Sequence, residues 1–227
     1  MRQKTKALIR FEILLMKKSV LLILMIGFSC FFTPLIIHLT SGNTDTEQWI
    51  FLLHIQMFFT ILLLPLIYSF LYDDEKQKMI SSVIVPKLYQ TDRYFHCKSC
   101  VLWGVICLIQ FISLALICVI QWLNGRAQVM ILLPLTAAGI ATIAFSVQVT
   151  VILSLLLRKQ IYVTIIMIVY LFSSMNFNVP YISIWFNPDW ITSNFFTWSF
   201  AFGRLFLFLI AWVLMRVSNH VWMARVS

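Results

Sequence analysis

Charged residues are scarce in this sequence, and their scarcity decides its class. Only 11% of the 227 residues are charged and 61% are hydrophobic, whereas a soluble domain has about 25% charged and about 45–50% apolar residues. The composition therefore argues against a water-soluble globular enzyme. It also excludes a disordered chain, because disorder needs low hydrophobicity. Glycine and proline, with six residues each, are too rare for a fibrous or linker-rich protein.

Several enzyme signatures are also missing. None of the glycines fits the G-x-x-x-x-G-K-S/T loop that cradles phosphate, and neither H-E-x-x-H nor G-x-S-x-G occurs. His96, Cys97 and Cys100 form H-C-x-x-C, but no second pair completes the four ligands of a zinc site. We therefore expect no catalytic residue, no metal site and no cofactor in this chain.

Long apolar runs are what the sequence does have. A helix needs about 20 apolar residues to cross a hydrocarbon core of about 30 Å. The longest polar segment, residues 72–100, leaves no room for a folded soluble domain. The sequence therefore predicts an all-α polytopic membrane protein, with residues 1–227 forming a single transmembrane domain of six helices. The six runs span residues 19–39, 50–71, 101–122, 130–157, 161–177 and 198–216.

Basic residues mark one side of these helices. With the N-terminus inside, every Lys and Arg except Arg126 and Arg204 falls on the inner side, as the positive-inside rule describes. This asymmetry predicts that both termini are cytoplasmic. It also explains the net charge of +9 by contact with the lipid bilayer, so we expect no nucleic acid as a partner. Tryptophan favours the headgroup layer. We expect Trp49, Trp122, Trp185, Trp190 and Trp198 near the outer interface, and Trp103 and Trp222 near the inner one.

Two segments outside the runs have an unusual composition. Residues 1–18 are basic with interleaved apolar residues, and Leu8, Phe11 and Leu15 share a helical face. This pattern predicts a helix lying in the cytoplasmic interface; the alternative is a disordered basic tail that only enforces topology. Residues 178–197 are rich in aromatic residues but contain two prolines, so we expect a re-entrant or interfacial hairpin on the outer side.

The fourth run is rich in small residues. Small residues four apart let membrane helices approach closely, so we expect this face to pack against another helix of the same chain. The alternative is that it lines a pathway. The small residues are Thr136, Ala137, Ala138, Gly139, Ala141, Thr142, Ala144 and Ser146.

Arg204 is the most informative single residue, because it lies about seven residues into the last apolar run. A charge at the centre of a membrane helix costs about 2.5–3.5 kcal/mol on insertion scales. One interpretation is that Arg204 faces a substrate path. The other is that its long side chain snorkels to the outer headgroups or pairs with Asp189 in the preceding segment.

The inner loop 72–100 contains the most specific pattern. Acidic residues at 73–75 complement the dipole at the start of a predicted short helix, an apolar stripe follows, and a proline marks the end. Such a stripe is buried either against the bilayer surface or in the groove of a soluble partner. The residues that we assign to docking on a partner are Asp74, Glu75, Met79, Ile80, Val83, Ile84 and Pro86.

Glu75, Lys78, Pro86, Arg93 and Lys98 resemble the inner-loop pattern of ABC type-2 transporter permeases. That pattern has a Glu, a stretch ending near Leu-Leu-x-x-Pro, a Ser-Arg pair and a Lys that opens the third helix. The opening RFEILLMKKS resembles the family's interfacial helix, and FNPDW resembles its re-entrant hairpin. The sequence departs from the pattern in lacking a Gly or Thr after Glu75 and in having Thr-Asp-Arg in place of Ser-Arg. The short chain looks most like permeases of bacterial peptide exporters, including lantibiotic-immunity systems.

The resemblance implies transport without catalysis in this chain. It implies that two permease chains, like or unlike, assemble with cytoplasmic ABC ATPase subunits in a bacterial cytoplasmic membrane. ATP and Mg²⁺ are then bound by the ATPase partners, whose closure moves the loop 73–98 and switches the cavity to face outward. The aromatic, poorly charged interior suits a peptide or another amphipathic or hydrophobic substrate.

Two other functions fit the same hydropathy. The first is a membrane substrate-binding subunit of a vitamin importer, which does not need the long charged loop between the second and third helices. The second is a non-transporting immunity or regulatory protein that only binds its ligand. Stimulation of ATP hydrolysis by substrate distinguishes a transporter from such a regulator.

Overall fold

A computed structural model describes residues 2–17, 19–32, 35–36, 46–71, 91–123, 129–157, 159–176 and 198–226. Within these residues the regular structure is entirely helical, which confirms the predicted all-α class. The helices are α1 (Arg2–Lys17), α2 (Val20–Gly27), the π-helix η1 (Phe28–Phe32), α4 (Thr46–Leu71), α7 (Thr91–Leu123), α8 (Val129–Leu157), α9 (Gln160–Asn176) and α10 (Trp198–Val226).

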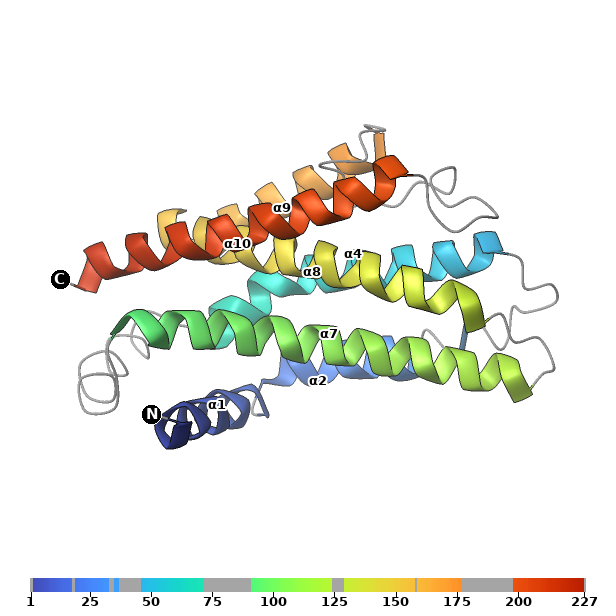
Figure 1. Ribbon diagram of the computed structural model, residues 1–227, viewed down its shortest axis with the longest axis horizontal. Helices are drawn as coiled ribbons and strands as arrows, with labels where there is room; N and C mark the ends of the chain where they lie inside the picture. The colour runs from blue at the N-terminus through green and yellow to red at the C-terminus, as the bar shows by residue number, and fades with distance from the viewer. Residues whose placement is uncertain are drawn as a thin grey trace.

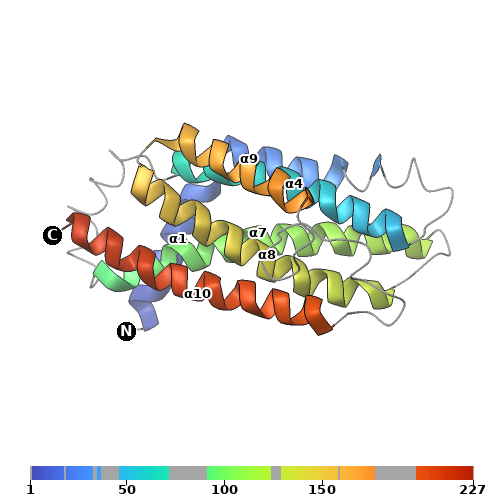
Figure 2. The ribbon, with the colours of Figure 1, turned by 90° about the horizontal axis from the view of Figure 1, so that it is seen from above.

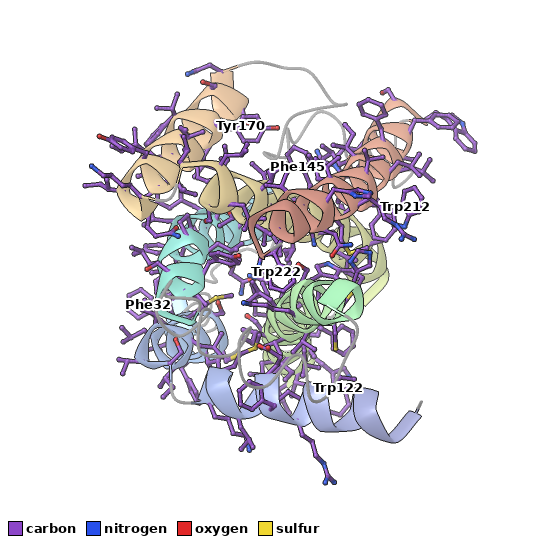
Figure 3. The ribbon with its side chains drawn as sticks, turned by 90° about the vertical axis from the view of Figure 1, so that its left-hand side faces the viewer. Phe32, Trp122, Phe145, Tyr170, Trp212 and Trp222 are labelled. Carbon is purple, nitrogen blue, oxygen red and sulfur yellow. The ribbon has the colours of Figure 1, made fainter. Side chains whose placement is uncertain are left out.

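The long helices form one elongated bundle. From α2 with η1 through α10, consecutive helices run along the same axis in alternating directions, and both ends of the chain lie at the same end of the bundle (Figure 1). Helix α1 differs from the others because it lies crosswise at that end, as the view along the bundle shows (Figure 3). We call this the α1 end of the bundle.

Three helices contain stretches that are long and apolar enough to cross a membrane, judged by length and composition. These stretches are His96–Val119 in α7, Ala137–Leu157 in α8 and Trp198–Trp222 in α10. Among the described residues, α2 with η1, α4 and α9 contain shorter apolar stretches. The structure is thus compatible with a membrane protein.

The apolar runs of the sequence locate the helices better than they locate the helix ends. Helices α8 and α9 begin and end within one residue of the predicted bounds. By contrast, α7 begins ten residues before 101, and α10 continues ten residues past 216. A helix ends at a capping residue or a backbone break rather than where hydrophobicity ends, and neither extension contains glycine or proline.

The first apolar run changes helix type part-way, which the sequence analysis did not predict. The Ser19 side chain caps α2 by accepting a hydrogen bond from the Leu22 amide at 3.3 Å. The α-helix ends at Gly27, and the chain continues as the π-helix η1. A π-helical turn shifts the register of the backbone hydrogen bonds and often marks a functional region.

Helix α8 is the centre of the bundle. It packs against α10, α7, α4 and α9, and Figure 2 shows it between α10 and the pair formed by α4 and α9. A Cβ atom at Gly139 would lie 2.9 Å from Met57 Cε of α4, so α4 approaches α8 very closely here. The predicted intramolecular packing of the small residues in this run is therefore confirmed. The buried ones are Ala138, Gly139, Ala141, Thr142, Ala144 and Ser146.

The exposure of the tryptophans differs between the two ends of the bundle. Trp122 and Trp198 are exposed on helix ends that lie opposite the α1 end (Figure 1). Trp222, predicted near the inner headgroups, is instead only 5% exposed within the core. Trp103 is half-buried and donates its indole N–H to the Ile140 carbonyl at 3.4 Å. For Trp103 the protein interior supplies polar and aromatic contacts, from the Ile140 carbonyl of α8 and the Phe208 ring of α10.

Candidate functional site

Arg204 lies on the buried face of α10. Its side chain is 6% exposed and follows the same face as Phe200, Leu207 and Ala211, which are also buried. Five large apolar side chains between them are exposed: Phe202, Leu205, Phe206, Phe208 and Leu209. The last apolar run is thus hydrophobic on both faces, and this is why its sequence pattern alone does not tell which way Arg204 points.

Neutral groups of two helices hold the guanidinium in place. Arg204 Nη1 donates a hydrogen bond to Thr142 Oγ1 of α8 at 2.8 Å, and Thr142 Oγ1 donates to the Ala138 carbonyl at 3.1 Å. The guanidinium carbon lies 4.7 Å from the centre of the Phe200 ring, a cation–π distance. This geometry favours an inward position of Arg204 over a position at the outer headgroups. The alternative partner Asp189 lies outside the described residues.

A third helix adds aromatic and polar groups to this site. Tyr170 of α9 interacts electrostatically with Arg204, and its ring centre lies 6.1 Å from that of Phe145 on α8. Ser174 Oγ, one turn further along α9, donates to the Tyr170 carbonyl at 2.8 Å. Figure 3 shows Tyr170 and Phe145 in the space between α9 and α10. The cation, the phenol and the aromatic rings together form what we call the Arg204 site.

A second polar cluster joins η1, α4 and α7, and the sequence analysis missed it. Gln56 Nε2 donates to the Ser29 carbonyl at 3.4 Å and to Ser113 Oγ, and Ser113 Oγ donates to the same carbonyl. One turn away, Gln110 Nε2 donates to Thr60 Oγ1 at 2.7 Å. All five residues are buried.

The spacing of these polar residues in the sequence indicates that they share helical faces, and it could have predicted the cluster. Gln56 and Thr60 are four residues apart on α4, and Gln110 and Ser113 are three apart on α7, so each pair shares a helical face. Each helix contributes one amide and one hydroxyl, and hydrogen bonds of this kind join helices in an apolar environment. The cluster therefore fits a role in packing η1, α4 and α7 together.

At the α1 end, opposite charges are buried between α1 and α7. Glu12 is fully buried and Lys98 is 3% exposed, and the negative charge of Glu12 attracts the ammonium group of Lys98. Met16, one turn after Glu12, is also buried, and α1 packs on α7 and α2. Residues 2–17 are therefore an ordered helix, and the alternative of a disordered basic tail is wrong.

The residues that we assigned to docking on a partner lie outside the described residues. So do residues 178–197, where we predicted the hairpin. The structure does show where the docking segment is attached, because α4 ends at Leu71 and α7 begins at Thr91, and both of these helix ends are at the α1 end (Figure 1). The docking residues are Asp74, Glu75, Met79, Ile80, Val83, Ile84 and Pro86.

The described part of the chain brings together no three His, Cys, Asp or Glu side chains that could hold a metal ion. His96 and Cys97 are half-buried near the start of α7, and Cys100 is exposed on the next turn. All five cysteines are free thiols.

No known protein family matches this chain, and neither a curated protein nor a solved structure is significantly similar to it.

Proposed function

We propose that this chain is the permease subunit of an ABC exporter in a bacterial cytoplasmic membrane. The observation that carries the proposal is the position of Arg204, a cation that α8, α9 and α10 enclose in an apolar bundle. Ionisable groups within membrane helices are costly and mark substrate or ion pathways. The inner-loop pattern around Glu75 and Pro86 supplies the link to ABC permeases.

The arrangement of the helices supports this assignment. In the proposal, all six apolar runs cross the membrane, both termini are cytoplasmic, and residues 178–197 form an outer re-entrant hairpin. The alternating direction of the helices and the crosswise α1 at the end that holds both termini agree with such a topology (Figures 1 and 3). The loop between α4 and α7 starts and finishes at that same end, where the ATPase subunits dock in this scheme.

Helix α7 is the element that can transmit the motion of the ATPase. It has 33 residues, so at 1.5 Å per residue it is about 50 Å long. It begins directly after the docking segment, lies against Glu12 of α1 through Lys98, and reaches the buried amide cluster through Gln110. Closure of two ATPase subunits on ATP and Mg²⁺ therefore shifts α7 as a rigid rod and changes its packing against α4 and α8.

The Arg204 site is the candidate substrate contact. Its guanidinium offers hydrogen bonds and positive charge, while Phe145, Tyr170 and Phe200 offer apolar ring surface. This combination suits an amphipathic peptide or another hydrophobic substrate with a polar group. A second permease chain, like or unlike, completes the translocation path in this proposal.

The proposal is tested by placing an acid in the predicted apolar stripe of the docking segment. A carboxylate forced into an apolar protein groove must be desolvated without a partner. Met79→Asp or Ile80→Asp should therefore abolish co-purification of the ABC ATPase with the chain in detergent, while membrane insertion is unchanged. Ser82→Asp adds the same charge outside the stripe and is the matched control.

The outcomes separate the alternatives. Detergent removes the bilayer surface but not a protein groove, so a stripe that only rests on lipid leaves co-purification intact in both variants. Normal co-purification together with normal substrate-stimulated ATP hydrolysis in both variants would refute the coupling assignment. A chain that never co-purifies with an ABC ATPase, even without substitutions, is instead a binding or regulatory protein.

A further inference from the structure

The exposed basic side chains gather at one end of the bundle. Among the basic side chains whose exposure the structure gives, Lys98 and Arg204 are buried and the other four are exposed. The exposed ones come from α1, from the connection between α8 and α9, and from the second half of α10, and all of these parts lie at the α1 end (Figure 1). The exposed residues are Arg10, Lys17, Lys159 and Arg216, and we call them the cationic collar.

Two collar residues lie beside exposed aromatic rings. The Arg216 guanidinium carbon is 5.2 Å from the centre of the Trp212 ring, and Lys159 Nζ is 6.0 Å from the centre of the Tyr162 ring. Both rings are about half exposed. A cation with an outward aromatic neighbour suits the boundary between headgroups and acyl chains, where the ring meets hydrocarbon and the charge meets phosphate.

The other two collar residues share the outer face of α1 with apolar side chains. Arg10, Ile13, Leu14 and Lys17 are all exposed, and their spacing places them on one broad side of the helix. Glu12 occupies the opposite, buried side. Because Glu12 and Met16 are buried on the side of α1 that packs against α7, the exposed basic and apolar residues face away from the bundle.

The charge at this end is complementary to a lipid phosphate. Glu12 is the only acidic side chain whose exposure the structure gives, and it is buried against α7, where it interacts electrostatically with Lys98. The collar therefore presents positive charge to its surroundings, and the exposed Ile13, Leu14, Trp212 and Tyr162 place that charge next to apolar surface. Free phosphate complements only the positive charge, whereas a phospholipid complements both the charge and the neighbouring apolar surface.

We propose that the cationic collar binds the headgroups of anionic phospholipids at the α1 end of the bundle. This inference does not rest on the proposed transport function, because it concerns only the outer surface of the chain. Each cation near a membrane surface contributes about a fivefold gain in affinity for an anionic lipid. Loss of two collar residues should thus weaken binding about thirtyfold.

The test uses the purified full chain in a neutral detergent, with dioctanoyl phosphatidylglycerol as the probe. Bound lipid is counted by native mass spectrometry across a lipid titration, and the midpoint of thermal unfolding is followed in parallel. Phosphatidylglycerol should bind and raise the midpoint, and dioctanoyl phosphatidylcholine should do so far less. Raising the ionic strength should weaken the binding of phosphatidylglycerol.

Four variants locate the binding. Arg10→Gln with Lys17→Gln, and separately Lys159→Gln with Arg216→Gln, should each lower the affinity about thirtyfold. Arg10→Lys with Lys17→Arg keeps the charge and should bind as the unaltered chain does. Arg126→Gln removes a positive charge outside the collar and should have no effect. Because the two Gln pairs lie on different elements, one pair remains informative if the other fails to fold.

Three results would overturn the proposal. The first is undiminished affinity for phosphatidylglycerol in the Gln pairs. The second is an equal loss of affinity in Arg126→Gln, which would mean that net charge alone matters. The third is an equal rise of the unfolding midpoint with inorganic phosphate at the same concentration, which would show an unspecific anion effect. Cations that served only to orient the chain during insertion would give the first result.

Discussion

The two buried cations of this bundle have different surroundings. Lys98 lies between α1 and α7 and is attracted by Glu12, the buried carboxylate of α1. Arg204 lies in the first half of α10, away from the α1 end, where a hydroxyl group and an aromatic ring hold its guanidinium. A carboxylate cancels the charge of a cation and ties two helices together. Thr142 and Phe200 position the guanidinium without cancelling its charge, and this difference suggests a structural role for Lys98 and a recognition role for Arg204.

The largest expected effect comes from breaking the charge attraction at the α1 end. Glu12→Ala leaves Lys98 buried without that carboxylate, and removal of one partner from a buried pair costs about 3–5 kcal/mol. We expect the midpoint of thermal unfolding in detergent to fall by many degrees. We also expect proteolysis to release α1 from the bundle.

A double variant separates charge from packing in this first prediction. Glu12→Leu combined with Lys98→Met replaces both charges by apolar side chains of similar size, and such replacements are often neutral or stabilising. Most of the lost stability should therefore return. If Glu12→Ala alone has no effect on the unfolding midpoint, the structural role assigned to Lys98 is wrong.

A smaller effect on stability, but a larger one on transport, is expected at Arg204. Arg204→Leu removes the charge but keeps the apolar contacts, and Thr142 Oγ1 retains its hydrogen bond to the Ala138 carbonyl. The unfolding midpoint should change little, while transport in reconstituted vesicles should fall at least tenfold, as expected from the loss of about 1.4 kcal/mol or more of substrate binding.

Arg204→Lys is the matched control, because it keeps the charge but loses the planar group that stacks on Phe200. It should retain part of the activity. Wild-type transport by Arg204→Leu at normal expression would contradict a recognition role and leave only a structural one. A large loss of stability in Arg204→Leu would make Arg204 resemble Lys98 and remove the contrast between the two cations.

The smallest expected effect concerns the rigidity of α8, which carries Thr142. A methyl group at Gly139 would meet the flexible end of Met57 at 2.9 Å, so Gly139→Ala should lower the free energy of unfolding by less than about 1 kcal/mol. At Gly104 of α7 a Cβ atom would meet nothing within 4 Å. Gly104→Ala should therefore be neutral or stabilising, by up to about 1 kcal/mol. Equal unfolding midpoints for both variants would show that α4 and α8 separate easily at this contact.

Part of the candidate site, Arg204, could be predicted from the sequence because long apolar runs seldom contain charged residues. Arg204 stands out because a charge inside an apolar run is rare and costly. The helical nature of residues 2–17 followed from the mixture of basic and apolar residues. The amide cluster was also detectable from polar pairs spaced three or four residues apart, although the sequence does not say that Gln56 faces Ser113.

The sequence by itself determined the class of the protein and the approximate positions of its helices. Apolar runs of about 20 residues predict helices long enough to cross a membrane, and the short link of residues 158–159 makes α8 and α9 antiparallel neighbours. The small residues of α8 predicted its close packing for the same local reason. These properties depend on the composition of one segment at a time, so they can be predicted from a single sequence.

The tertiary structure alone decided which polar groups meet. Arg204 and Thr142 are 62 residues apart, and Gln56 and Ser113 are 57 apart. Helices such as α8 are apolar on every face, so periodicity does not reveal which side is inward. The contact partner of a buried charge is set by how several such helices pack. The local sequence therefore identifies the polar and charged residues that are unfavourable within apolar helices, and the packing of the bundle determines which groups they contact.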